Sequence, residues 1–265
     1  MSLQRHFTDD GGREVDWSRT SDDYAEHRPD YPAEFYDRLA ERGIGLRGQQ
    51  ILDLGTGVGF LAHNFAVRGA HVTGIDIAAG QLEVARRRAA AANLDIQYSE
   101  ASAEKTDLPD TKFDVITASQ CWHYFDKFRA TSEVKRLIKP SGFLAISHLC
   151  WLPLESPIAQ RSEELVLKYN PDWTGAGFSG ETSREPPDYF AGHFHQVELM
   201  VFNVEVPFTR ESWRGRWRAC RGVGATLASA QIEQFDSDHA KLLASTVDQE
   251  FVVLHQIVCR ILRAE

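Results

Sequence analysis

The feature that most restricts the fold of this chain is the stretch ILDLGTGVGF, residues 51–60. An apolar run containing Asp53 is followed by three alternating glycines, Gly55, Gly57 and Gly59, and then by a helical stretch. Glycine lets the backbone turn tightly after a strand and lets a ligand lie directly on the main chain. The N-terminus of the next helix favours negative charge. The pattern predicts a ligand-binding turn between a strand and a helix, with a tight turn lacking a ligand as the alternative.

Short apolar runs alternate with helical stretches along most of the chain, which is typical of parallel strands joined by right-handed helical crossovers. Strands are predicted at 49–54, 71–76, 95–100, 113–119, 142–147, 197–206 and 250–262, and helices at 33–43, 59–68, 81–93, 127–138, 209–221 and 230–244. The last run is rich in β-branched residues, which favours a strand over a helix, the competing interpretation. We expect an α/β, Rossmann-like, doubly wound, mostly parallel seven-stranded sheet with an inserted cap and an antiparallel C-terminal strand.

Proline and glycine mark the expected divisions of this single domain. Residues 150–195 contain repeated prolines and a glycine-rich run, so they are predicted to form the inserted cap of the substrate region. Residues 1–45 are predicted to be an arm and a helix that close the cofactor site, the first 20 being a loose arm. Residues 46–149 form the predicted cofactor-binding core, and residues 196–265 complete the sheet.

The overall composition argues against several classes of protein. A net charge of −9 disfavours a nucleic-acid backbone as the main partner. The N-terminus has no apolar signal-peptide core, and no apolar run approaches the ~20 residues that span a bilayer. The four cysteines form no Cys-x-x-Cys pair, so they are typical of reduced thiols and no metal site is expected. We expect a soluble, cytoplasmic monomer or homodimer without membrane contact.

An acidic residue, Asp76, ends the second predicted strand. The carboxyl ends of parallel strands meet at one edge of a sheet, so Asp76 is expected beside the glycine turn, followed by Ile77 and Gln81. Its two oxygens can accept hydrogen bonds from both hydroxyls of a ribose. Asp76 therefore indicates a nucleoside without separating NAD from S-adenosylmethionine, and a helix-capping role is the alternative.

The spacing of the glycines distinguishes between NAD and S-adenosylmethionine as the expected cofactor. The third glycine of the dinucleotide fingerprint G-x-G-x-x-G falls on Phe60 when counted from Gly55, and on Ala62 when counted from Gly57. The frame apolar-Asp-apolar-Gly-x-Gly-x-Gly instead resembles the first motif of class I S-adenosylmethionine-dependent methyltransferases. The resemblance implies that the cofactor is bound by Asp53, Gly55, Thr56, Gly57, Gly59, Asp76, Ile77 and Gln81.

Residues 99–109, SEASAEKTDLP, resemble the segment of this family that closes over the adenine. Ser102 stands where the family usually has aspartate, and a hydroxyl hydrogen-bonds an adenine amino group more weakly than a carboxylate does. Ala103 and Glu104 match the family pattern. The resemblance implies that all three residues bind the cofactor.

Residues 119–146 resemble the tip of the family's fourth strand and the turn into the fifth. The resemblance implies that Ser119 and Gln120 line the methionine portion of the cofactor. Trp122 is a candidate substrate residue and His123 a candidate catalytic residue facing the methyl group. Packing under the sheet edge is the alternative for both.

The N-terminal segment Y-x-x-x-R-P-x-Y-P, residues 24–32, resembles the arm of a small-molecule subgroup that includes trans-aconitate methyltransferases. Tyr24 and Arg28 are four residues apart, so on a helix they would share a face and could bind the methionine carboxylate. Solvated arm residues are the alternative for each.

These observations predict methyl transfer from S-adenosylmethionine to a small-molecule acceptor, a carboxylate or a hydroxyl. A hydroxyl would need a base, and His123 and His148 fall near carboxyl ends of strands. Arg214 and Arg218 lie on one face of a predicted helix and are candidate substrate residues, with a solvated face paired to acids as the alternative. An NAD(P)-dependent oxidoreductase and a non-catalytic S-adenosylmethionine-binding subunit are the rival functions.

Overall fold

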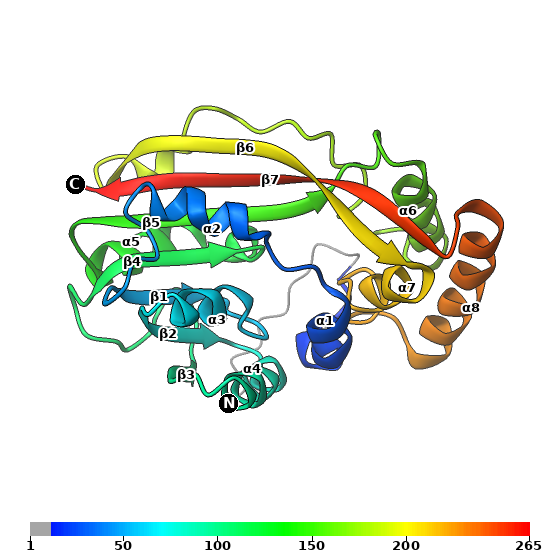
Figure 1. Ribbon diagram of the computed structural model, residues 1–265, viewed down its shortest axis with the longest axis horizontal. Coiled ribbons are helices and arrows are strands. Elements are labelled where there is room, and N and C mark those ends of the chain that lie inside the picture. Colours follow the sequence, from blue (N-terminus) through cyan, green and yellow to red (C-terminus); the bar gives the residue numbers. More distant parts are fainter. Residues whose placement is uncertain (1–11) are drawn as a thin grey trace.

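The computed structural model describes residues 12–265, and its strands form one sheet of order β3-β2-β1-β4-β5-β7-β6 (Figure 1). The strands are β1 (Gln50–Leu54), β2 (His71–Asp76), β3 (Ile96–Glu100), β4 (Phe113–Ser119), β5 (Ile138–Trp151), β6 (Phe194–Thr209) and β7 (Glu250–Ala264). Strands β1 to β5 pair in parallel, and β7 runs antiparallel between β5 and β6. This confirms the predicted fold class and the prediction of a strand at 250–262.

Helices pack on both faces of this sheet. They are α1 (Ser21–His27), α2 (Ala33–Ala40), α3 (Phe60–Val67), α4 (Ala79–Ala91), α5 (Lys127–Leu137), α6 (Pro157–Tyr169), α7 (Arg210–Arg218) and α8 (Ser229–Thr246). Neighbouring residues of a strand point to opposite faces, so Ile51 packs with α2 and α3 while Leu52 packs with α5. Within residues 12–265 no helix is both long and apolar enough to cross a bilayer.

The segment predicted as a loose arm, residues 1–20, is partly ordered. Residues 1–11 lie outside the described residues, but Trp17–Thr20 form a short 3-10 helix that leads into α1. Helix α1 ends at Arg28, whose backbone is extended because it precedes Pro29. The sequence analysis predicted neither this helix nor α6.

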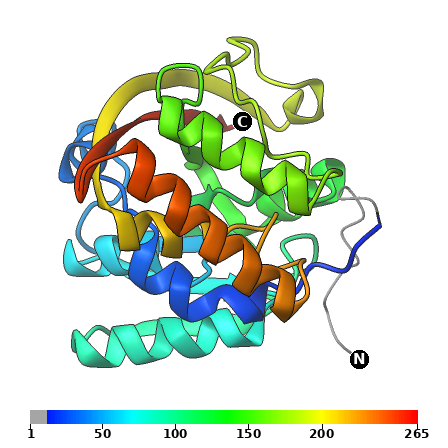
Figure 2. The same ribbon diagram turned by 90° about the vertical axis from the view of Figure 1, so that its right-hand side faces the viewer.

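A helical cap covers the carboxyl ends of the parallel strands, where β5, β6 and β7 extend beyond them (Figure 1). Figure 2 faces this end and shows α6 (green), α8 (orange) and α1 (blue) lying across it. Buried side chains from these strands, α6, α7 and α8 form its core, including Trp151, Trp213, Trp217 and Phe235. The cap is thus wider than the predicted insertion at 150–195, because α1, α7 and α8 come from other parts of the chain.

Candidate cofactor and acceptor site

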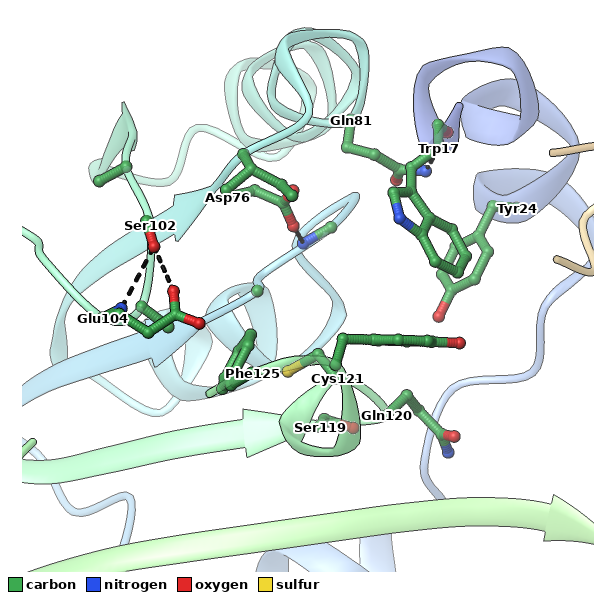
Figure 3. Close-up of a pocket in the computed structure, with 16 residues that line it drawn as sticks. Trp17, Tyr24, Asp76, Gln81, Ser102, Glu104, Ser119, Gln120, Cys121 and Phe125 are labelled. Carbon is green, nitrogen blue, oxygen red and sulfur yellow. Dashed lines mark hydrogen bonds between the residues drawn. The ribbon is translucent and has the colours of Figure 1, made fainter. Parts of the chain in front are cut away.

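A cavity lies where β1, β2 and β4 end beneath the cap (Figure 3). Its wide part encloses about 980 Å³, open solvent included, and is lined by Trp17, Tyr24, Gly55, Gly57, Asp76, Ile77, Gln81, Ala101, Ser102, Ala103, Glu104, Ser119, Gln120, Cys121, Tyr124 and Phe125. Its narrow part is lined by Tyr24, Arg28, Pro29, Asp30, Tyr31, Asp53, Gly55, Thr56, Gly57, Phe60, Leu61, Ser119 and Gln120. The two parts share the wall residues Tyr24, Gly55, Gly57, Ser119 and Gln120 and are therefore adjacent.

The cavity brings together every predicted cofactor residue except Gly59. Gly59 instead caps the N-terminus of α3 with φ +83°, and a Cβ atom there would lie 2.5 Å from the Tyr98 hydroxyl. The third glycine of the motif is therefore required by backbone conformation and by the packing of Tyr98, and it does not line the cavity.

The glycine turn is joined to the end of β2 through Asp76. Gly57 N–H donates to Asp76 Oδ2 and Ala78 N–H to Asp76 Oδ1, both at 2.9 Å. Each oxygen keeps a lone pair for a ligand hydroxyl. Gly57 has φ +55°, and a Cβ atom there would meet only Gln81 Oε1, at 3.6 Å. That Gln81 oxygen is buried without a partner among the described residues, so a hydroxyl donor beside Gly57 would satisfy it.

The buried carboxylate of Asp53 holds the glycine turn through hydrogen bonds. It is 2% exposed and accepts hydrogen bonds from the Thr56 hydroxyl at 2.7 Å and the Thr117 hydroxyl at 2.6 Å. Burial raises the pKa of Asp53 to about 6, and the nearby Asp76 adds to the shift. Asp53 therefore fixes the loop to β4 as well as lining the narrow part of the cavity.

The far wall of the wide part is built by Ser102 and Glu104, opposite Trp17 and Tyr24 (Figure 3). The Ser102 hydroxyl donates to Glu104, whose other oxygen accepts the Asp126 N–H at 2.8 Å. Ser102 therefore uses its hydroxyl proton within the wall, and because its oxygen also accepts the Glu104 N–H at 3.3 Å, it keeps one lone pair for a ligand. This leaves it able to accept from an adenine amino group.

Tyr24 and Arg28 meet at the narrow part, although Arg28 ends α1 in an extended conformation and is not helical. The Arg28 guanidinium carbon lies 5.3 Å from the centroid of the Tyr24 ring, and Arg28 Nη2 donates to the Leu149 carbonyl at 3.2 Å. Gln120 Nε2 donates to the same carbonyl at 2.9 Å. The end of β5 thus fixes two polar side chains of the cavity wall.

His123 and His148 lie together, with ring centroids 5.9 Å apart, but neither lines the two parts of the cavity. His148, on β5, follows Ser147, whose carbonyl accepts the Gln120 N–H at 2.9 Å. Burial, and then Arg28, lower the pKa of His148 to about 4. Burial, and then the nearby His148, also lower the pKa of His123. Both imidazoles are therefore neutral at pH 7.

Three residues predicted to bind substrate have other contacts. Trp122 is 4% exposed, stacks on Phe190 and donates from Nε1 to the Tyr189 hydroxyl at 3.2 Å, so it packs beneath the site. Arg214 and Arg218 line neither part of the cavity. They form a network of ion pairs that joins α7 to α1 and α8, with the acidic partners Asp23, Glu211 and Asp236. The alternative interpretation, a helix face paired with acids, is the one observed.

Several wall residues were not predicted to bind the cofactor. Trp17 lies in the segment taken for a loose arm, yet its carbonyl accepts the Gln81 Nε2–H at 3.0 Å and its ring lies 5.0 Å from that of Tyr124. No local pattern points to Trp17, since its partners are distant in sequence. Tyr124 and Phe125 belong to the aromatic cluster after β4, which was the available signal for them.

Comparison with known proteins agrees with this geometry. Residues 52–146 match the family described as methyltransferase domain. A ubiquinone biosynthesis O-methyltransferase of Albidiferax ferrireducens is 34% identical over 176 residues, covering 63% of this chain and 67% of the relative. A protein of the same name from Alkalilimnicola ehrlichii is 35% identical over 140 residues, covering 52% of this chain and 57% of the relative. The chain thus spans about three fifths of the length of the curated relatives it matches.

Solved structures share the fold. A candidate type II methyltransferase from Anaeromyxobacter dehalogenans superposes with a TM-score of 0.59 at 21% identity, covering 88% of this chain and 97% of that one. The YcgJ protein of Bacillus subtilis has a TM-score of 0.51 at 19% identity, covering 88% and 99%. The matching methyltransferase domain and the relatives above identify the chain as a member of the class I S-adenosylmethionine-dependent methyltransferases.

Proposed function

We propose that this chain transfers the methyl group of S-adenosylmethionine to an oxygen atom of a small-molecule acceptor. The observation that carries the proposal is the joined turn of Gly57 and Asp76, which offers backbone and carboxylate to a nucleoside at the strand ends. The relatives are O-methyltransferases by name, which supports oxygen as the methylated atom.

The described residues fit this cofactor along its whole length. Asp76 and the unpartnered Gln81 oxygen suit the two ribose hydroxyls, and Ser102 with Glu104 suits the adenine. In the narrow part, Arg28 with Tyr24 suits the methionine carboxylate, because a guanidinium fork binds a carboxylate through two hydrogen bonds. With the cofactor in this order, we expect its methyl group near Ser119 and Gln120, which line both parts of the cavity.

When bound, S-adenosylmethionine supplies a methyl group already activated by its sulfonium sulfur. The chain must therefore orient the acceptor oxygen and exclude water. The Tyr31 hydroxyl holds Ser119 at 2.9 Å and Ser147 at 3.1 Å, which ties the ends of β4 and β5 together behind the reacting atoms. The cap covers this point from above.

For a hydroxyl acceptor, we propose His148 as the proton acceptor, with His123 beside it. Because neither ring lines the two parts of the cavity, the acceptor hydroxyl would lie beyond them, on the side of β5. With its pKa lowered to about 4, the His148 imidazole is unprotonated above about pH 5 and can take a proton. A carboxylate acceptor would need no base. The likeness of residues 24–32 to trans-aconitate-type enzymes supports an acidic acceptor and is kept here as a proposal.

The test is methyl transfer from labelled S-adenosylmethionine to a panel of phenols and small carboxylic acids. We expect a methylated product, with His148→Gln lowering kcat for phenols by about 100-fold and leaving it unchanged for carboxylates. The wild-type kcat/KM for phenols should be level between about pH 6 and 8 and fall only below about pH 5. Cofactor binding without methylation of any acceptor would instead support a non-catalytic subunit.

A further inference from the structure

A buried arginine in the cap has no partner. Arg216, on α7, is 6% exposed, and its guanidinium carbon lies 4.8 Å from the centroid of the Trp151 ring. Its Nε is buried without a hydrogen bond, and no ion pair joins it to any residue between 12 and 265. Arg214 and Arg218, on the same helix, are both held by carboxylates. Arg216 therefore differs from its neighbours in charge compensation as well as burial.

The surroundings of Arg216 do not supply the missing negative charge. The titratable groups that act on it most strongly are Arg28, Cys220, Tyr24 and Cys150. Of these groups, Arg28 is a cation, so it adds positive charge beside Arg216. Burial lowers the pKa of Arg216 to about 10, which leaves the guanidinium protonated at neutral pH. A buried charge without a counterion is strongly unfavourable, so the site is incomplete as residues 12–265 build it.

The acid that contacts Trp151 is already occupied. Glu163 Oε1 accepts from Trp151 Nε1 at 2.6 Å, and Oε2 accepts from Gly177 N–H at 2.9 Å. Glu163 thus ties α6 and the following loop to β5. Glu163 is not among the groups with the largest effect on the pKa of Arg216, so it does not serve as the counterion.

Two more unpartnered polar atoms belong to residues that neighbour Trp151. The Trp217 ring lies 4.7 Å from it, and Trp217 Nε1 is buried without an acceptor among the described residues. His255 is the register partner of Trp151 on β7, and its Nε2 is buried without a partner there too. Buried polar groups in native proteins are nearly always satisfied, so three orphan nitrogens on neighbours of Trp151 indicate a polar ligand.

Arg216, Trp217 and His255 line neither part of the cavity, but Arg28 and Tyr24, which line the narrow part, are near enough to act on the charge of Arg216. Arg28 bonds the Leu149 carbonyl, and Trp151 follows two residues later on β5, roughly 7 Å along the strand. Arg28 therefore lies nearer the cofactor, and Arg216 lies farther toward the cap. The cofactor has one carboxylate, for which Arg28 is proposed, so a second anion is needed beside Arg216.

We propose that Arg216 binds an oxyanion, a carboxylate or a phosphate, carried by the methyl acceptor. The inference rests on the proposed function, since it places the acceptor between the bound cofactor and the cap. A planar guanidinium flanked by an indole N–H suits a trigonal or tetrahedral oxyanion and fixes its orientation. Arg216 is thus a specificity residue, and it selects acidic acceptors over neutral ones of similar shape.

The test titrates citrate and inorganic phosphate, by calorimetry, into the wild-type chain saturated with S-adenosylhomocysteine. Arg216→Met keeps the contact with Trp151 and removes the charge, whereas Arg214→Met is the matched control on the ion-paired side of α7. We expect Arg216→Met to weaken oxyanion binding by about tenfold or more and Arg214→Met to change it less than about twofold. The tighter of the two probes distinguishes a carboxylate from a phosphate.

Thermal unfolding of the ligand-free variants separates binding from structure. Removing an uncompensated buried cation should leave the Tm of Arg216→Met unchanged or raised, and Arg216→Lys should fold with weakened oxyanion binding. Unchanged oxyanion affinity in Arg216→Met, or no binding of either probe to the wild type at about 20 mM, would overturn the inference. Failure of the wild type to bind S-adenosylhomocysteine at all would instead count against the proposed function.

Discussion

The cofactor end of the cavity and its cap end hold their polar side chains in different ways. At the cofactor end, hydrogen bonds join residues close in sequence, such as Thr56 to Asp53, 3 residues apart, and Gly57 to Asp76, 19 apart. At the cap end, Arg218 bonds Asp23 across 195 residues. The glycine turn is thus held mainly within one βαβ unit, with Thr117 of β4 as a more distant partner of Asp53, whereas the cap depends on how distant segments meet.

A second difference lies in what each end leaves unsatisfied. The acids of the cofactor end have hydrogen-bond donors from the chain itself, as Asp53 and Asp76 show. The cap end keeps Arg216 without a counterion among the described residues. We infer that a preformed turn recognises the cofactor, whereas a charged side chain left without a counterion recognises the methyl acceptor.

The largest effect should come from the glycine turn, if the cofactor lies on its backbone. Gly57→Val adds a β-branched side chain at φ +55°, in the space toward Gln81. We expect S-adenosylhomocysteine affinity, measured by calorimetry, to fall by about 1,000-fold or beyond detection. Gly177→Val is the matched control, because Gly177 also has positive φ, at +78°, but has open space around it. Equal losses in both variants would mean that backbone strain, and not cofactor contact, is responsible.

Asp76→Ala should have the next largest effect at the same end. It removes the acceptor of the Gly57 and Ala78 N–H groups and both proposed ribose contacts. Losing two charge-assisted hydrogen bonds should weaken S-adenosylhomocysteine binding by about 10- to 1,000-fold, with the chain still folded. Unchanged affinity by calorimetry would remove Asp76 from the site.

Asp53 makes the cofactor end sensitive to pH in the absence of ligand. Burial raises its folded pKa from 3.8 to about 6, so the folded chain holds the proton more tightly than the unfolded chain. The stability from this group is complete below about pH 4 and is lost as pH rises through 6, by on the order of 2–3 kcal/mol. Urea unfolding of wild type and Asp53→Asn from pH 4 to 8 should show this difference, and parallel pH curves would contradict it.

Glu163 offers a comparable perturbation at the cap end. Glu163→Ala removes the acceptor of Trp151 Nε1 and Gly177 N–H and should cost about 1–3 kcal/mol of unfolding free energy. Glu163→Gln keeps one acceptor oxygen and should cost less. Because the change is confined to the cap, S-adenosylhomocysteine affinity should stay close to that of the wild type. A large loss of affinity would show that the two ends are coupled.

The smallest effects should come from Arg214→Lys and Arg218→Lys. Their partners Asp23, Glu211 and Asp236 are partly exposed, so we expect each change to alter stability by about 1 kcal/mol or less. The KM for the acceptor should not change, because neither residue lines the cavity. Steady-state kinetics showing a several-fold rise in KM would restore them as substrate residues.

The same contrast explains what could be predicted from the sequence. Alternating apolar and helical segments predicted a doubly wound, mostly parallel core, and the motif at 51–60 with Asp76 predicted the cofactor turn, because these depend on local spacing. Trp17 and Arg216 could not be found in this way, since their neighbours come from distant segments. The helical pattern of α7 indicated its arginine face at 214 and 218, but not that acids on α1 and α8 would neutralise it.

The most direct measurement is a calorimetric titration of the wild-type chain with S-adenosylhomocysteine and, separately, with NAD. The glycine spacing and the walls of the cavity predict saturable binding of S-adenosylhomocysteine with a Kd in the micromolar range, about −8 kcal/mol, and no detectable binding of NAD. Binding of NAD without S-adenosylhomocysteine would contradict the assignment of the cavity and would support an oxidoreductase.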